Sequence, residues 1–333
     1  MQIALLVWSG TTFAADKVYV ANEGADMVSV HDAVSFEKLA SVPVGQAPHN
    51  VQVSPDGKFA WVTNNGEPAQ NVPHKGGGHG SHGAMAQPGA VWVIDTSTQA
   101  VVDKVPVGAH PAHVVVTPDG SLAYVTNGGD NSVSVIDTSA RKLVATIAVG
   151  QYPHGLRVSP DGKEVYVANL KGGTVSVIDT ASQKEVAQLP VGKGPAQTGF
   201  APDGRFAFVS LSEENAVALI DPATRKVIRK IAVGTVPIQL FATPDSRTLL
   251  VANQGTRKVP GKTVSLIDLE TFKVVKTVET GNGAHGVVVD RDGRLAYVTN
   301  IYANSVSVVD LKDGSVTKTI PVGKAPNGIS IAP

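Results

Sequence analysis

The sequence predicts an all-β fold, a seven-bladed β-propeller, and three observations lead to this prediction. A V-G-x-x-P segment recurs along the chain, and the glycines of its seven copies are separated by 63, 42, 42, 42, 47 and 42 residues. Between successive copies lie four short runs rich in Val, Ile and Thr, punctuated by Gly, Pro and Asp. The chain opens on a second run and closes on a first run. Four antiparallel strands in each repeat of about 42 residues are typical of a propeller blade.

The repeat that begins at Gly108 illustrates the elements in order. Its four strands are expected at 113–117, 122–126, 132–137 and 143–149. Pro118-Asp119-Gly120 supplies the turn between the first two strands, because Pro fixes its own backbone and Gly accepts a left-handed one. The polar residues 127–131 then connect the second strand to the third.

The ends of the chain are expected to share one blade. First strands are predicted to begin near residues 49, 112, 154, 196, 238, 285 and 327, and second strands near 17, 59, 122, 165, 206, 248 and 295. Residues 17–21 would therefore pair with residues 327–332. Such pairing covers both terminal strand edges, which would otherwise be open to aggregation. We accordingly expect a single domain over residues 15–333.

The second strands carry a recurring motif. It reads Tyr19-Val20-Ala21-Asn22, Trp61-Val62-Thr63-Asn64 and Tyr124-Val125-Thr126-Asn127, with further copies at 166–169 and 297–300. With the Ser-Pro-Asp-Gly turns and the V-S-V-I-D third strands, this resembles the YVTN-repeat β-propeller family, which includes the YncE-like exported propellers of bacteria. The resemblance covers residues 17–333 and implies the fold and export. Because propellers host many unrelated activities, it says little about function.

Residues 1–14, MQIALLVWSGTTFA, are interpreted as a partial signal peptide, because a short apolar run precedes small residues suited to cleavage. An ordinary N-terminal strand is the alternative. No segment approaches the roughly 18 consecutive apolar residues of a membrane span. The expected location is therefore periplasmic or secreted.

Composition excludes several classes of function. Lys+Arg and Asp+Glu both number 28, so the formal net charge is zero, which argues against nucleic acid or an anionic membrane as partner. Cysteine is absent, which rules out thiolate metal sites and covalent c-type haem. No P-loop or dinucleotide fingerprint stands in its required context, so no nucleotide cofactor is expected. The aspartates that follow the third strands, such as Asp137 and Asp179, are expected to hold turns rather than to catalyse.

The histidines suggest a metal site. His49, His154 and His285 share one repeat position, at the start of the first strand, and His113 stands one position later. The first strand is innermost in a propeller, so the four imidazoles are expected to surround one mouth of the central channel. The corresponding region of other blades holds Gln197, Gln239 and Asn327, and we expect these residues, with Arg157 and Glu67, to support the ligands. His31 is interpreted as structural.

An insertion at 67–89 is expected on the same face, because it connects a second strand to a third. It is rich in glycine and contains His74, His79, His82 and Met85. Imidazole and thioether donors without thiolates suit copper, and imidazoles alone also suit zinc.

Three hypotheses follow. The first is a periplasmic copper or zinc carrier whose His-rich loop acts as a flap and whose metal binding weakens below about pH 6. The second is a copper-dependent oxidoreductase, since a ring of propeller histidines is similar in kind to the copper-holding channels of nitrous oxide reductase and thiocyanate dehydrogenase. The third is a metal-free scaffold for a periplasmic protein partner, in which the repeated histidines reflect duplication. No catalytic residue is assigned.

Overall fold

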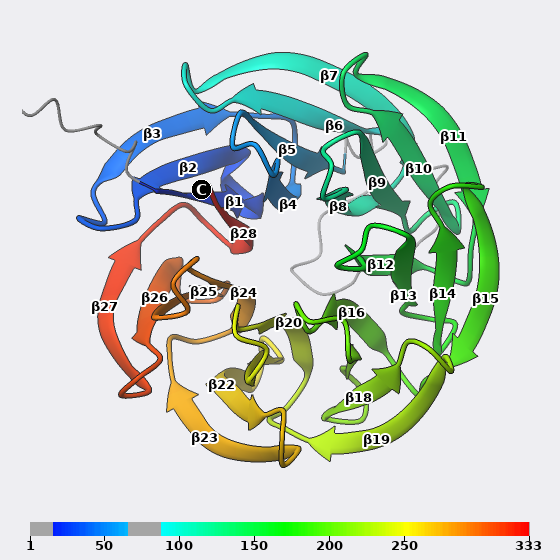
Figure 1. Cartoon of the computed structure of the whole chain (residues 1–333). Coiled ribbons are helices and arrows are strands. Elements are labelled where there is room, and N and C mark those ends of the chain that lie inside the picture. The colour runs from blue at the N-terminus through cyan, green and yellow to red at the C-terminus, as the bar shows by residue number, and fades with distance from the viewer. Residues whose placement is uncertain (1–15, 66–87, 333) are drawn as a thin grey trace, which may run out of the picture.

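The computed structural model describes residues 16–65 and 88–332 of the chain. Seven sheets of four antiparallel strands are arranged around a central axis, as Figure 1 shows. The predicted seven-bladed propeller is therefore confirmed. Within residues 16–65 and 88–332, the structure contains no helix that could span a membrane.

The blade that joins the two ends of the chain consists of β28 (Pro326–Ile331), β1 (Lys17–Asn22), β2 (Met27–Asp32) and β3 (Lys38–Pro43), in that order. Val18 pairs with Ile331, and Tyr19 pairs with Ser330. The predicted sharing of one blade by the two ends is thus confirmed. A short 3-10 helix, η1 (Glu23–Ala25), connects β1 to β2.

The other six blades each contain four consecutive strands, with the lowest-numbered strand innermost. The first two of these blades are β4 (Pro48–Val53), β5 (Phe59–Asn64), β6 (Pro88–Asp95) and β7 (Ala100–Ala109), and β8 (Pro111–Val116), β9 (Leu122–Asn127), β10 (Ser132–Asp137) and β11 (Lys142–Ala148). The next two are β12 (Pro153–Val158), β13 (Glu164–Asn169), β14 (Thr174–Asp179) and β15 (Lys184–Pro190), and β16 (Pro195–Phe200), β17 (Ala207–Leu211), β18 (Ala216–Asp221) and β19 (Lys226–Ala232). The last two are β20 (Pro237–Ala242), β21 (Thr248–Gly255), β22 (Pro260–Asp268) and β23 (Lys273–Glu279), and β24 (Ala284–Val289), β25 (Leu295–Asn300), β26 (Ser305–Asp310) and β27 (Ser315–Pro321).

The motif of the second strands is structural. Its aromatic residue is buried in the core, as Tyr124 and Tyr166 show. Its Asn side chain donates hydrogen bonds to hydroxyls of the third strand: Asn127 Nδ2 contacts Ser132 Oγ at 3.0 Å and Ser134 Oγ at 2.9 Å. The motif therefore ties the end of the second strand to the start of the third, where a buried amide would otherwise lack partners.

The aspartates after the third strands hold turns, as predicted. Asp137 Oδ1 accepts hydrogen bonds from Ala140 N at 2.8 Å and from Ser139 Oγ at 2.7 Å. The backbone N–H of Ala140 and the Ser139 hydroxyl favour the ionised form and lower the pKa of Asp137. Equivalent contacts are made by Asp179, Asp221, Asp268 and Asp310.

The innermost strands are irregular where they begin. The ladder between β4 and β5 is interrupted between Pro48 and Val51, and β8 and β12 show the same interruption after their own prolines. The two residues that follow each proline are thus released from regular pairing. Their side chains are positioned by contacts across the channel and between blades instead.

Candidate metal centre

Three histidines from three consecutive blades meet at the channel. His49 lies on β4, His113 on β8 and His154 on β12, each within the irregular start of its strand. One ring nitrogen from each lies within 4.8 Å of the others. The ring centres are separated by 5.0 to 5.5 Å, and the His49 and His154 rings meet edge to face at 87°. We call these residues the three-His cluster.

Threonine hydroxyls from the second strands bridge the backbones of the cluster. Thr126 Oγ1 accepts a hydrogen bond from His113 N at 3.0 Å and donates one to the carbonyl oxygen of His154 at 2.6 Å. Thr63 Oγ1 acts in the same way between Asn50 N and Ala112 O, at 3.0 and 2.7 Å. Two hydroxyls therefore join β4, β8 and β12. The threonine of the repeat motif thus holds together the backbones of the three strands that carry the imidazoles.

A glycine next to His154 allows the neighbouring blade to approach. A Cβ at Gly155 would lie 1.9 Å from Gln197 Oε1 and 2.5 Å from Ala196 O. This close approach places Ala196 O 2.9 Å from His154 Nδ1. A carbonyl only accepts, so Nδ1 of His154 carries the proton, and Nε2 presents a lone pair.

His49 has a defined hydrogen-bond environment as well. Asn327 Nδ2 lies 3.1 Å from His49 Nδ1 and 2.7 Å from Glu23 Oε2. An amide NH₂ only donates, so Nδ1 of neutral His49 accepts and its proton is on Nε2. That Nε2 atom lies 3.2 Å from His154 Nε2 and donates to it. The two Nε2 atoms therefore face one another.

His113 is the most deeply buried member of the cluster, with 1% of its surface exposed, against 4% for His154 and 13% for the His49 side chain. Its Nε2 has no hydrogen-bond partner among the described residues. Burial, followed by the positive charge that His154, His49, Arg157 and His285 can carry, holds the pKa of His113 well below its usual 6.5. His113 is therefore neutral at physiological pH, the form in which imidazole binds metals.

The cluster fits a metal ion. Zinc–imidazole bonds of about 2.0–2.1 Å in a tetrahedral site place ligand nitrogens roughly 3.3 Å apart. The 3.2 Å between His49 Nε2 and His154 Nε2 meets this requirement, and His113 Nε2 offers a buried nitrogen with no competing partner in the described chain. Three imidazoles without a thiolate suit zinc and copper, and they leave a further coordination position.

Apart from Arg157, which lies on β12, the other residues predicted for the site divide into three groups. Asn327 contacts His49 directly, and Gln197 borders His154 through Gly155. His285 and Gln239 lie on β24 and β20, and neither belongs to the three-His cluster. His74, His79, His82, Met85 and Glu67 lie outside the described residues, as does the segment 1–14. Of the predicted insertion 67–89, residues 88 and 89 begin β6.

Glu23 is a residue of this region that the sequence did not identify. It belongs to η1, and its Oε2 lies 3.8 Å from His49 Nδ1. Its position at the end of a second strand, immediately after the motif Asn22, places it in the type of connection that reaches the channel mouth. This position in the repeat could have identified Glu23 as a residue near the channel mouth.

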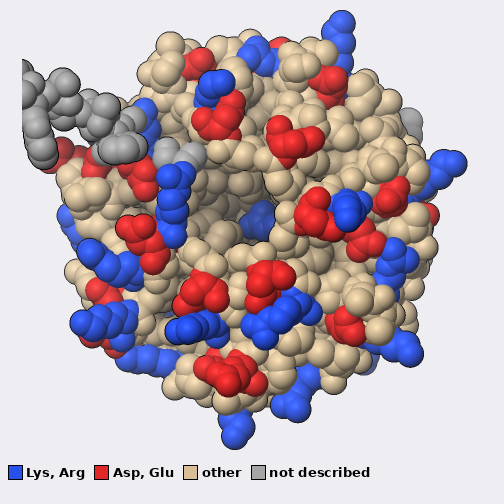
Figure 2. All heavy atoms as spheres, in the orientation of Figure 1, with Lys and Arg blue, Asp and Glu red and all other residues tan. Residues whose placement is uncertain are grey.

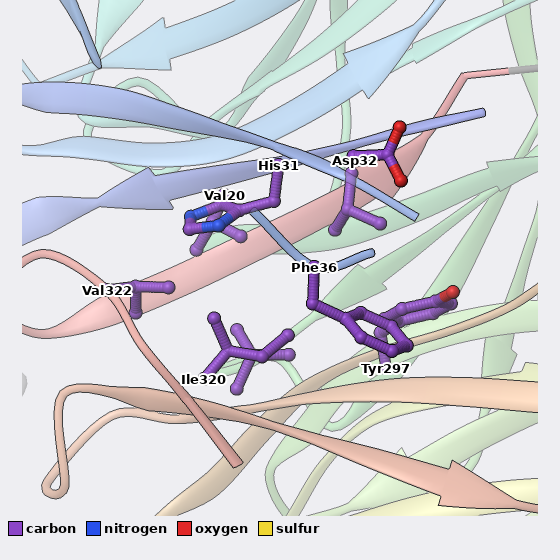
Figure 3. Close-up of a pocket in the computed structure, with 9 residues that line it drawn as sticks. Val20, His31, Asp32, Phe36, Tyr297, Ile320 and Val322 are labelled. Carbon is purple, nitrogen blue, oxygen red and sulfur yellow. The ribbon is translucent and has the colours of Figure 1, made fainter. Parts of the chain in front are cut away.

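His31 lies elsewhere and is structural, as predicted. It projects from β2 into an apolar pocket of about 10 Å³ lined by Phe36, Tyr297, Ile320 and Val322 (Figure 3). It is 3% exposed, and neither ring nitrogen has a hydrogen-bond partner among the described residues. Burial lowers the pKa of His31 below its usual value.

Solved structures with a similar fold are numerous. Hydrazine synthase of Kuenenia stuttgartiensis superposes with a TM-score of 0.71 at 24% identity, covering 85% of this chain and 89% of that one. The periplasmic gluconolactonase of Pseudomonas aeruginosa gives a TM-score of 0.73 at 18% identity, covering 96% and 99%. At these identities the likeness concerns the fold alone.

Sequence relatives extend the comparison. Antigen Lp49 of Leptospira interrogans is 28% identical over 125 residues, which are 38% of this chain and 25% of that protein. Residues 255–332 match the family described as YNCE-like β-propeller. Residues 12–189 match the family described as lactonase, 7-bladed β-propeller, and this segment is more than half of the chain. The chain therefore belongs to the family of seven-bladed β-propeller lactonases.

Proposed function

We propose that this protein binds one copper or zinc ion through His49, His113 and His154 and serves as a periplasmic metal carrier. The observation that carries the proposal is the convergence of three imidazole nitrogens within 4.8 Å. His154 presents the lone pair of its Nε2, and His113 is held neutral by burial. Metal binding by His49 Nε2 requires its proton to move to Nδ1, which lies 3.8 Å from Glu23 Oε2. The three imidazoles are close together before any metal enters, which lowers the entropic cost of binding.

The imidazole and thioether donors are compatible with two metals, copper and zinc. Copper(II) is favoured over zinc by most nitrogen ligands, and copper is the metal that a Met85 thioether in the 67–89 insertion would favour. Zinc accepts three imidazoles in a tetrahedral site with one open position. We therefore assign the insertion as a second donor segment that captures the metal for the three-His cluster.

The periplasmic location is supported by the YNCE-like match and by the likeness to a periplasmic gluconolactonase. The apolar residues 3–8 followed by small residues agree with export.

A metal-dependent enzyme is the second candidate, favoured by the open coordination position and by membership of the lactonase family. A bound metal would supply Lewis-acid chemistry to a lactone, or redox chemistry if the metal is copper. In either case the protein residues would orient the imidazoles: Glu23 and Asn327 hold His49, and Ala196 O holds His154.

The proposal is tested by titrating metal-free protein with Co²⁺, which reports coordination number through its visible spectrum, and then with Zn²⁺ and Cu²⁺. One tightly bound ion per chain with nitrogen ligands is expected, and absence of that spectrum contradicts the site. Turnover of δ-gluconolactone by the loaded protein would replace the carrier assignment with the enzyme. Deleting residues 67–87, which leaves β6 whole, is expected to slow metal capture while the spectrum of the loaded site is kept.

A further inference from the structure

Arg157 lies across the central channel. Its Nη1 donates a hydrogen bond to Gln52 Oε1 on β4 at 3.3 Å, and its guanidinium carbon lies 5.9 Å from the centre of the Phe241 ring on β20. These strands belong to different blades on opposite sides of the blade that contains β12, so the side chain extends from its own blade toward both. Figure 2 shows a hollow at the centre of one face, with a basic side chain inside it.

The positive charge of Arg157 is not neutralised by a nearby carboxylate. Arg157 is the one Lys or Arg on the seven innermost strands, all of which the structure describes, and these strands contain no Asp or Glu. No carboxylate of the described residues forms an ion pair with it. Desolvation lowers the pKa of Arg157 to about 10, so it stays charged at neutral pH.

A half-buried guanidinium without a counter-charge is costly to a fold. The charge also reaches His113, whose pKa it helps to lower. Arg157 therefore contributes a positive charge to the channel even without a metal. An anion in the channel would relieve this cost.

A second polar group of the innermost strands, the Gln239 side chain, also lacks a partner among the described residues. Gln239 is 3% exposed, and its Nε2 has no hydrogen-bond acceptor among the described residues. It lies on β20, two residues before Phe241, and therefore on the strand that Arg157 approaches. Buried amide donors normally find an acceptor. The Arg157 guanidinium and Gln239 Nε2 are both hydrogen-bond donors, and both would be satisfied by oxygen acceptors.

The chemistry of these groups favours a carboxylate. The planar guanidinium fork matches two carboxylate oxygens in a bidentate arrangement. The ring of Phe241 offers an apolar surface beside the charge, which an organic acid would cover and an inorganic oxyanion would not. We propose that the channel of this protein binds a small organic carboxylate on Arg157, with the apolar part of the ligand against Phe241.

The proposal does not depend on the metal site, so it is tested on chelator-treated, metal-free protein. The probes are sodium acetate and sodium butyrate, with butyramide as the uncharged analogue of butyrate and sodium phosphate as the inorganic oxyanion. The readout is the ligand-dependent shift of Tm at constant ionic strength. Arg157→Gln removes the charge. Arg229→Gln is the matched control, because Arg229 contacts the Phe272 ring at 5.4 Å from the exposed outer strand β19.

Butyrate is expected to raise the Tm of the parent and of Arg229→Gln saturably, with acetate weaker and butyramide inactive. Arg157→Gln should lose the shift, with an apparent Kd at least tenfold weaker, and without ligand it should melt no lower than the parent. Arg157→Lys keeps the charge but not the fork, and should reduce the shift if Arg157→Gln does not fold. An unchanged shift in Arg157→Gln, an equal shift with butyramide, a shift with phosphate alone, or no shift with either carboxylate would overturn the proposal.

Discussion

The Nε2 atoms of His49 and His154 lie 3.2 Å apart, although 105 residues separate them in the chain. They meet because β4 and β12 are innermost strands of blades with one blade between them, and β8 of that blade contributes His113. Near the axis, side chains of alternate blades come within contact distance. Ligands from distant parts of the sequence can therefore form one site without any helical or hairpin metal motif.

Membership of the three-His cluster should decide which histidine replacements remove metal. His154→Ala and His113→Ala are each expected to weaken Zn²⁺ binding at least 100-fold, or about 2.7 kcal/mol, because a three-ligand site becomes a two-ligand site. His285→Ala should change the Kd less than threefold, since His285 lies outside the cluster. Competition with a chromophoric chelator measures the three values. A loss in His285→Ala equal to that in His154→Ala would show that the cluster is misassigned.

The Thr126 hydroxyl should influence both stability and metal affinity. Thr126→Val leaves His113 N–H and His154 C=O without their partner, which should cost about 1–3 kcal/mol of unfolding free energy. Ser210→Ala is the matched control, because Ser210 Oγ forms the same bridge between Gln197 N and Ile238 O, and neither residue belongs to the three-His cluster. Urea denaturation should show losses in both variants. Only Thr126→Val should bind Zn²⁺ more weakly, with Thr126→Ser close to the parent.

Glu23 should raise the metal affinity of the three-His cluster although it is not itself a ligand. Its carboxylate holds Asn327, which contacts His49, so Glu23→Gln removes a negative charge 3.8 Å from His49 Nδ1. We expect Zn²⁺ affinity to fall about tenfold, as is usual when the partner of a metal-binding histidine is altered. Unfolding free energy should change little, because the side chain is one-third exposed. Unchanged affinity would mean that His49 is oriented without Glu23.

His31 should make the propeller sensitive to acid. Its pKa is lowered in the folded state, so the unfolded chain binds more protons below about pH 6.5 and stability falls as the pH drops through this window. Each pH unit removes up to about 1.4 kcal/mol until the folded-state pKa is reached. His31→Leu, which fills the same apolar pocket, should make this slope shallower and leave the part that comes from His113, whose pKa is also lowered. It should therefore raise the Tm more at pH 5 than at pH 7.5. If the stability of His31→Leu falls with pH in parallel with that of the parent, the slope comes from groups other than His31.

The fold could be predicted from the sequence because each blade repeats the same pattern of strand and turn residues. The predicted third strand 132–137 matches β10. The observed first strands begin at the junction proline, or at Ala284 in β24, one residue before the predicted starts near 49, 112, 154, 196, 238, 285 and 327. The turn aspartates and the motif asparagines also act locally, within one blade. Such features depend on short-range contacts that a repeat makes visible.

The site was less predictable, because it depends on contacts between blades. His113 stands one position later in its repeat than His49 and His154, yet it joins them, whereas His285 shares their position and does not. The interrupted ladders at the start of β4, β8 and β12 allow either of two positions to face the channel. Glu23 meets Asn327 across 304 residues of sequence, through the closure of the ring. The spacing of residues along the chain could not predict this contact between Glu23 and Asn327.

The most direct test of the three-His cluster is the metal content of the protein as its host makes it. Untagged protein, purified without chelators, would be compared by mass spectrometry with the His49/His113/His154→Ala variant and with a deletion of residues 67–87, which leaves β6 whole. We predict about one copper or zinc per chain in the parent, retention of that metal in the deletion, and none in the triple variant. A parent that stays metal-free even after reconstitution at neutral pH, or a triple variant that keeps the same metal, would contradict the account.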